Sequence, residues 1–195
     1  HDWRAGPHRG VVTRSVVVIA HRPGNPKSIH SFSDLSRKDI DVIYPDPKTS
    51  GGAMWVVCAI YGAGLKQSAH ENTKPDPDYA RQFLKSIQKR VAVMDESGRM
   101  SVQTFESGRG DALVTYENEA LLRQKQGDEF PFFVPSATIE IENPVALVDK
   151  NVDKHGNREA AEAFVRFLYA KSAQRAFARC GFRPVDPEVA EAFAE

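Results

Sequence analysis

A serine followed by two glycines, Ser50-Gly51-Gly52, has the residue types of an anion site at the start of a helix. The first backbone amides of a helix have no acceptor within the helix, and they lie at the positive end of its dipole. Glycines let a ligand approach these amides closely, and a serine hydroxyl either caps the helix or donates to the ligand. The segment therefore predicts donors for a small anion. The alternative interpretation is an ordinary capped helix start with two flexible residues.

The elements around this segment must place it at a turn from a strand to a helix. Residues 40–44 are rich in β-branched and aromatic side chains and predict a short buried strand. Residues 52–66 form an apolar run that predicts a buried helix. In an open α/β sheet, ligands bind at the carboxyl ends of the strands, which is where such a turn lies.

Two further turns occupy the same place in the pattern. A strand predicted at 91–94 is followed by Ser97 and Gly98 just before a helix, and a strand at 111–116 ends at Tyr116, which again precedes a helix. Two Ser/Gly turns at one edge of one sheet predict a pocket lined by amide donors and suited to a small oxyanion.

The rest of the chain continues the alternation of strands and helices. This pattern predicts an α/β fold with a mostly parallel sheet flanked by helices. Further strands are expected at 11–21, 130–134 and 138–149, and further helices from Asp78 through Ile87 and at 100–107, 117–125, 159–169 and 172–180.

Composition excludes several classes of function. The chain has 26 basic and 26 acidic side chains, and a formal net charge of zero argues against a nucleic-acid binder. No apolar run has the length of a membrane span. The histidines form no metal-ligand spacing, and no nucleophile or acid–base signature occurs. We therefore expect no metal, no cofactor and no catalytic residue, so the chain is not expected to be an enzyme.

The two cysteines, Cys58 and Cys180, are far apart in the sequence. Cys58 falls within the apolar helix and is expected to be a small buried hydrophobic residue. The spacing does not favour a disulfide between the two, and the sequence leaves that question open.

Long blocks of this sequence resemble the sulfate-binding proteins of bacterial ABC transporters. The blocks are Asp46 to Ala53, Gly110 to Ala120, Pro144 to Lys154 and Phe182 to Pro187, with shorter ones at Gly24 to Lys27 and Phe167 to Tyr169. The resemblance covers the chain from about residue 11 to about residue 189. It implies a lobe of a type II periplasmic binding protein, which binds sulfate in the periplasm and delivers it to a membrane permease.

The resemblance also implies which residues bind the ligand. The family holds a dehydrated sulfate dianion through uncharged donors, namely backbone amides at helix starts, a serine hydroxyl and an indole N–H. On that pattern the ligand-binding residues are Ser50, Gly51, Gly52, Ser97, Gly98 and Tyr116. Tyr116 stands at the position of the indole, and a phenol can donate as well, with a different reach.

Other positions also depart from the family pattern. Glu96 and Met100 occur in a turn that the family builds from small residues, and Met54 stands where an arginine is usual. A buried Glu96 would accept a hydrogen bond from a protonated oxyanion and repel sulfate, whereas a solvated Glu96 is the ordinary alternative. The ligand is therefore expected to be sulfate, with thiosulfate, molybdate or phosphate as alternatives.

The resemblance implies a domain organisation. Residues 1–16 would be a hinge and a remnant of the first lobe, 17–145 the second, ligand-binding lobe, and 146–195 the hinge return with C-terminal helices that pack on the first lobe. Most of that first lobe has no counterpart here. The apolar side chains of the C-terminal helices then imply dimerisation, swapping or local disorder.

A second class of function stays open. Effector lobes of some transcription regulators share this architecture and bind small anions, so an anion sensor is an alternative to a transport receptor. A helix-turn-helix ahead of this sequence would favour the sensor, and a signal peptide would favour transport.

Overall fold

The computed structural model describes residues 2–69 and 74–193, and the chain divides into two units. We call Val16–Glu140 the sheet unit, and residues up to Ser15 together with those from Ile141 onward the terminal unit. The boundaries expected from the resemblance were 16/17 and 145/146. The assignment of the two parts to lobes stays a prediction.

The sheet unit is built on five strands in the order β3-β2-β4-β1-β5. Their bounds are β1 Val11–His21, β2 Val42–Ile43, β3 Val91–Val93, β4 Ala112–Tyr116 and β5 Phe132–Phe133. Strand β2 runs parallel to both neighbours, with Val42 opposite Val91 on one side and Ala112 on the other. Strand β1 runs antiparallel to β4 and to β5.

The α/β class is therefore confirmed, and the sheet is mixed. The prediction of a mostly parallel sheet holds for β3, β2 and β4 and fails at β1. Residues 16–20 of β1 are buried, and such an apolar run indicates a strand covered on both faces. It carries no information about the direction of the neighbouring strands, so the sequence could not reveal the antiparallel pairing.

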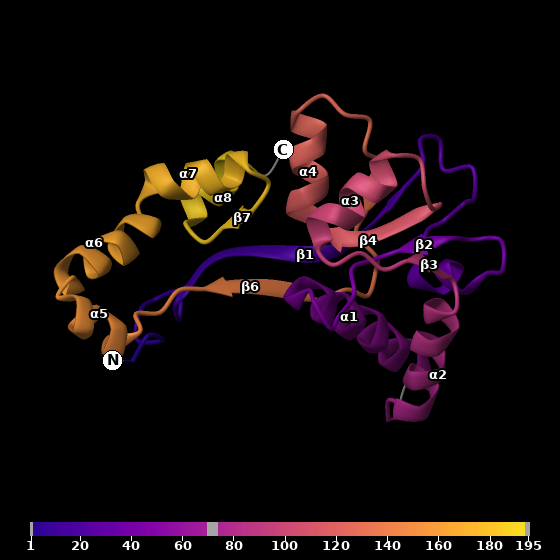
Figure 1. Cartoon of the computed structure of the whole chain (residues 1–195), viewed down its shortest axis with the longest axis horizontal. Coiled ribbons are helices and arrows are strands. Elements are labelled where there is room, and N and C mark those ends of the chain that lie inside the picture. The colour runs from indigo at the N-terminus through magenta and orange to yellow at the C-terminus, as the bar shows by residue number, and fades with distance from the viewer. Residues whose placement is uncertain (1, 70–73, 194–195) are drawn as a thin grey trace. The chain divides into compact units, whose positions relative to one another are not determined.

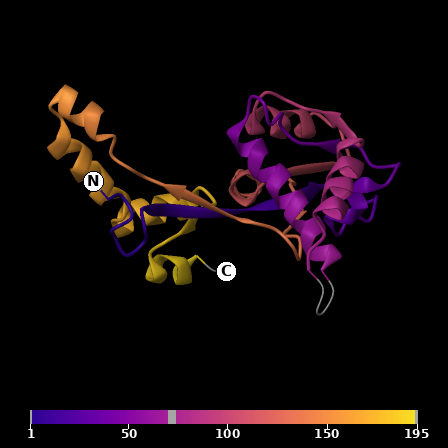
Figure 2. The same ribbon diagram turned by 90° about the horizontal axis from the view of Figure 1, so that it is seen from below.

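Helices cover both faces of this sheet (Figures 1 and 2). They are α1 Gly51–Ser68, α2 Pro77–Gln88, α3 Gly98–Glu106 and α4 Glu117–Lys125, with a short 3-10 helix at Phe32–Ser36. Asp76 caps α2 by accepting from the amides of Asp78 and Tyr79, and Pro77 follows it at the first helical position. Figure 1 shows α3 and α4 on one face and α1 and α2 on the other.

The core between the sheet and α3/α4 contains alternate residues of β1. Val16, Val18 and Ala20 pack in one cluster with Val102 and Phe105 of α3. This is the period of two expected for side chains that point to one face of a strand. The same cluster contains Ala120 of α4, so it holds α3 and α4, two of the three helices that carry predicted binding residues, on the sheet.

The terminal unit contains the helices α5 Asp149–His155, α6 Arg158–Leu168, α7 Lys171–Arg179 and α8 Pro187–Ala192. Strand β6, Glu140–Pro144, pairs with β1, and β7, Arg183–Pro184, pairs antiparallel with Thr13 and Arg14 of β1. Buried Gln174 of α7 donates to the carbonyl oxygens of Val12 and Leu168 and accepts from the amide of Val185. One side chain thus joins β1, the end of α6 and the residue after β7.

The strand predicted over 138–149 is wrong at its end. It ends at Pro144, and helix α5 begins at Asp149, where the sequence predicted no helix. The helix ends at Gly156, which adopts a left-handed conformation with φ 63°. Residues 145–148 are apolar, so the sequence predicted that the strand continues through them. An apolar pattern does not show where strand pairing stops.

The expectation for Cys58 is also wrong. Both Cys58 and Cys180 are exposed and carry free thiols. Helix α1 buries Val56 and Ile60, whereas Cys58 lies with the exposed side chains of Met54 and Trp55. The whole segment is apolar, so its composition did not show which face points outward.

Candidate functional site

Three helices of the sheet unit begin where the parallel strands end. Strand β2 leads to α1, β3 leads to α3, and β4 leads to α4. Because β2 is parallel to both β3 and β4, their carboxyl ends lie at one edge of the sheet. All six predicted binding residues lie at these three helix starts.

The first helix start is shaped by Asp46. Its side chain accepts from the amide of Lys48 at 2.8 Å, and its carbonyl oxygen accepts from the amide of Ser50 at 2.9 Å. Ser50 then stands at the N-cap of α1 with extended backbone, and its hydroxyl makes no capping hydrogen bond. Gly51 and Gly52 follow as the first helical residues, whose amides have no acceptor within the helix. This turn therefore offers a hydroxyl and amides to a ligand.

Two hydrogen bonds join the first turn to the second. The amide of Asp46 donates to the carbonyl oxygen of Asp95 at 2.8 Å. The hydroxyl of Thr49 donates to the carbonyl oxygen of Glu96 at 3.0 Å. These contacts lie directly before Ser50 and Ser97, so the structure brings the two Ser/Gly helix starts together.

The second helix start is capped by Ser97. Its hydroxyl oxygen accepts from the amide of Met100 at 3.3 Å, which leaves its hydrogen available for donation. Gly98 is the first residue of α3, and a Cβ added there would meet no atom within 4 Å. Tight packing is therefore not the reason for a glycine at this position. Without a side chain, the backbone of Gly98 is open to a ligand.

The third helix start contributes Tyr116. Its hydroxyl donates to the carbonyl oxygen of Gly52 at 3.1 Å, and burial raises the pKa of the phenol to about 12. This bond supports the first turn of α1, a contact that the sequence did not reveal. The role of Tyr116 toward a ligand stays a prediction.

Two acidic residues, Asp95 and Glu96, precede the second helix start, and their carboxylates differ in exposure. Glu96 is exposed, which fits a solvated carboxylate and not a buried acceptor. Asp95 accepts from the hydroxyl of Thr104 at 2.9 Å through one oxygen, and its other carboxylate oxygen is buried without a hydrogen-bond partner. In the described part of the chain, Asp95 forms no ion pair with an arginine or lysine. An anion at this edge would therefore be held by amides and hydroxyls against nearby negative charge.

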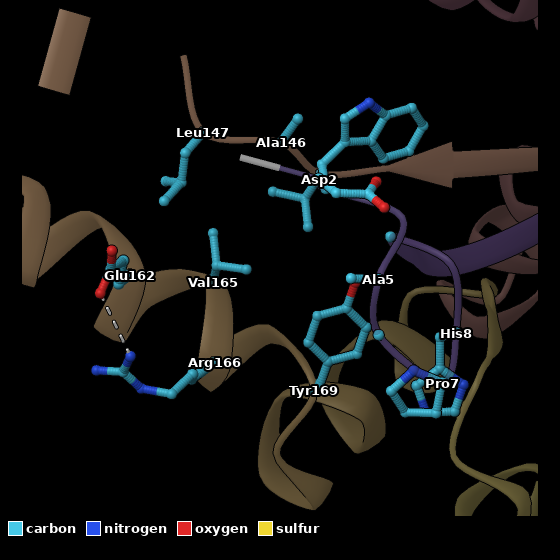
Figure 3. Close-up of a pocket in the computed structure, with 14 residues that line it drawn as sticks. Asp2, Ala5, Pro7, His8, Ala146, Leu147, Glu162, Val165, Arg166 and Tyr169 are labelled. Carbon is cyan, nitrogen blue, oxygen red and sulfur yellow. Dashed lines mark ion pairs between the residues drawn. The ribbon is translucent and has the colours of Figure 1, made fainter. Parts of the chain in front are cut away.

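A cavity of about 590 Å³ lies within the terminal unit (Figure 3). Its walls come from the segment Asp2–Gly10, from Val145–Leu147 and from one face of α6. Figure 3 shows Val165 pointing toward the segment that carries Ala146 and Leu147, and the ring of Tyr169 lying beside Ala5. None of the six predicted binding residues lines this cavity. Sequence reasoning missed it, because its walls come from three separate segments.

Comparison with known proteins identifies the family. Residues 3–183 match the model of the bacterial extracellular solute-binding proteins. The chain belongs to this family. Its members bind solutes and are not enzymes, in agreement with the expectation that the chain has no catalytic role. Among residues 2–69 and 74–193, no helix is both long and apolar enough to cross a membrane.

The relatives of this chain include sulfate- and thiosulfate-binding proteins, which confirms the resemblance seen in the sequence. The chain is 39% identical over 182 residues to the sulfate-binding protein of Synechococcus elongatus, covering 93% of this chain and 50% of that protein. It is 36% identical over 192 residues to the thiosulfate-binding protein of Escherichia coli, covering 96% and 55%. The chain thus spans about half the length of the curated relatives it matches.

A solved structure agrees with the fold. The sulfate-binding protein SubI from Mycobacterium tuberculosis superposes with a TM-score of 0.84 at 38% identity, covering 99% of this chain and 64% of that one. The α/β architecture of this chain is therefore that of a sulfate-binding protein.

Proposed function

We propose that this chain binds a sulfate-like oxyanion at the starts of α1 and α3, as part of the solute-binding component of an ABC transporter in the periplasm. The observation that carries the proposal is the pair of hydrogen bonds from Asp46 and Thr49 to the turn at Asp95 and Glu96. They hold two Ser/Gly helix starts side by side. The names of the relatives, sulfate- and thiosulfate-binding proteins, support the ligand class.

The chemistry of binding rests on neutral donors. The amides of Gly51, Gly52 and Gly98 belong to helix starts, where backbone dipoles favour an anion without an ion pair. The hydroxyls of Ser50 and Ser97 add directional donors. Hydrogen bonds to a charged oxyanion are short and strong, so a few of them can replace part of its hydration shell.

A sulfate dianion suits this donor set, because it presents only acceptors. A protonated oxyanion would need an acceptor from the protein. Glu96 is solvated and does not provide a buried one, whereas Asp95 has a buried carboxylate oxygen without a hydrogen-bond partner. We place sulfate ahead of phosphate because the relatives are named as sulfate- and thiosulfate-binding proteins, and phosphate is the alternative. The sheet unit is the ligand-binding lobe in this proposal, and the bound anion is delivered to a membrane permease.

The test is calorimetry. Sulfate is titrated into the unchanged chain and into two variants that each carry one proline substitution. Gly51 and Gly98 are the first residues of α1 and α3, where proline is favoured and removes only an orphan N–H. The preceding residues Ser50 and Ser97 have extended backbone, which a following proline requires. Each of Gly51→Pro and Gly98→Pro should weaken sulfate binding by about tenfold to a hundredfold, the effect of about 1.5–3 kcal/mol per charged hydrogen bond.

The matched control is Lys171→Pro at the first position of α7, outside the site. Ala170 before it is also extended, so the same change is made at a helix start that the proposal does not use. Unchanged binding in this variant and weakened binding in the other two supports the site. Equal binding in all variants contradicts it. Titration with thiosulfate, phosphate and molybdate then orders the ligands, and a preference for phosphate would contradict the assignment of sulfate.

A further inference from the structure

Large apolar side chains stand at both Ser/Gly helix starts of the proposed anion site. Met54 and Trp55 are the fourth and fifth residues of α1, and Met100 is the third residue of α3. Their exposed fractions are 56%, 45% and 43%. None of the three belongs to the apolar cluster that holds α3 and α4 on the sheet. We call Met54, Trp55 and Met100 the apolar rim.

The geometry of a helix directs the apolar rim toward the anion donors. Side chains in a helix tilt toward its N-terminus, so each one covers the turn before its own Cα. Met54 and Trp55 therefore lie beside Gly51, three and four residues earlier. Met100 lies beside Ser97, three residues earlier, whose hydroxyl accepts from the Met100 amide. The donors of each helix start thus have an apolar neighbour.

An apolar rim does not suit a sulfate ion, whose four oxygens share its negative charge. An oxygen turned toward a thioether or toward the face of an indole ring loses water without gaining a donor, which is unfavourable. A sulfonate, R–SO₃⁻, has three oxygens for the donors and a carbon substituent in place of the fourth oxygen. That substituent gains from apolar contact, and flexible methionine side chains adapt to its shape.

The charge near the turns favours a ligand with a single negative charge. Asp95 has a buried carboxylate oxygen without a hydrogen-bond partner, and within the described residues it forms no ion pair. The neighbouring cations Lys48 and Arg99 are exposed, so water and salt screen them more than the buried oxygen. Repulsion by Asp95 is about twice as large for a dianion as for a monoanion. A sulfonate carries one negative charge, whereas sulfate carries two.

We propose that the ligand of this site is an organosulfonate with an apolar substituent. Its three oxygens accept from the hydroxyls and amides of the two helix starts, and its substituent lies against the apolar rim. The inference rests on the proposed function, because it uses the same donors. It goes further by assigning a carbon group to the position that the fourth oxygen of sulfate would occupy.

The first experiment is calorimetric titration of the chain with methanesulfonate, ethanesulfonate and butane-1-sulfonate, beside sulfate and thiosulfate. Each added CH₂ group should tighten binding by about twofold to fourfold, because apolar surface is buried against the rim. Butane-1-sulfonate should also bind more tightly than sulfate.

The outcomes separate this inference from the proposed function. Sulfate binding without any gain along the sulfonate series overturns the inference and leaves the proposed function supported. Thiosulfate binding that is tighter than that of every sulfonate also overturns it, since the rim would then accept the terminal sulfur of a dianion. Binding of none of these anions overturns both proposals.

The second experiment tests the apolar rim with Met54→Gln and Met100→Gln, which keep an unbranched side chain of similar length and make its end polar. Each change should lower the ratio of butane-1-sulfonate affinity to methanesulfonate affinity by about twofold to fivefold. Because this ratio compares two ligands on one protein, a general loss of stability cancels.

The matched control is Met94→Gln. Met94 is 39% exposed and belongs to neither helix, since it lies between β3 and α3. Its ratio of affinities should equal that of the unchanged chain. Equal ratios in all three variants, or an equal fall in all three, would overturn the role of the rim.

Discussion

The hydroxyl of Tyr116 donates a hydrogen bond to the carbonyl oxygen of Gly52 over 3.1 Å. Tyr116 stands at the N-cap of α4 and Gly52 in the first turn of α1. A Cβ added at Gly52 would lie 3.3 Å from the same hydroxyl. The two helix starts are thus braced against each other at the edge where the anion site is proposed.

Replacing Tyr116 by phenylalanine should loosen this brace. The loss of one neutral hydrogen bond should lower the free energy of unfolding by about 0.5–1.5 kcal/mol. Sulfate binding should weaken as well, because the amides of the first turn of α1 are no longer held in place. Urea titration and calorimetry measure the two effects. Tyr79→Phe is the control, since Tyr79 is an exposed tyrosine of α2. Equal stability of the two variants would contradict a bracing role.

Stability should fall in alkaline solution because of two tyrosines. Burial raises the pKa of Tyr116 to about 12, and burial followed by the charge of Asp46 raises the pKa of Tyr44 to about 12. The unfolded chain loses these protons at about pH 10, so between pH 10 and 12 it binds fewer protons than the folded chain. Their contribution is fully present below pH 10 and is lost as the pH rises toward 12. Urea midpoints measured from pH 8 to 11.5 should be flat and then decline, and the decline should be shallower in Tyr116→Phe. An identical decline in that variant would exclude Tyr116 as a cause.

Two glycines of α1 should respond in opposite ways to alanine. A Cβ at Gly64 would lie 2.9 Å from the Cα of Ala80 in α2, so Gly64→Ala should push the helices apart and cost about 1–3 kcal/mol. A Cβ at Gly62 would meet nothing within 4 Å. Gly62→Ala should therefore stabilise the helix by about 0.5–1 kcal/mol through its higher helix propensity. Thermal unfolding of both variants tests the packing of α1 on α2, and a neutral Gly64→Ala would show that this contact can relax.

Gln174 should be the most sensitive polar residue of the terminal unit. Its side chain is buried and bonds to Val12, Leu168 and Val185. Gln174→Met keeps the volume but orphans these backbone groups, and each buried orphan costs about 1–3 kcal/mol. Limited proteolysis should then cleave residues 141–193 faster than the sheet unit. Gln103→Met, at an exposed position of α3, is the control. Similar cleavage of the two variants would mean that Gln174 is replaceable.

Both thiols should react in the native state. Cys58 and Cys180 are exposed and free, so a colourimetric thiol reagent should titrate two groups per folded chain without a reductant. A single reactive thiol, or none, would indicate that one side chain is covered or that a disulfide forms.

The sequence by itself predicted local features, namely the turns and helix starts that depend on residues adjacent in the chain. Ser50-Gly51 and Ser97-Gly98 were each predicted to lie directly before or at a helix start, and α1 and α3 begin at Gly51 and Gly98. The family resemblance added the binding proteins to which the chain is similar. These features are local in the chain, because turns and caps form within about four residues.

Only the tertiary structure showed the features that join distant segments. Strand β1 pairs antiparallel with β4, a strand far away in the sequence. The hydrogen bond between Tyr116 and Gly52 joins residues 64 positions apart, and the one between Gln174 and Val12 joins residues 162 positions apart. The tertiary structure also showed which face of α1 carries Cys58. Residue types and spacing indicate that a group is apolar or can donate, but its partner is selected by packing of the whole chain, where burial and hydrogen bonds must be satisfied together.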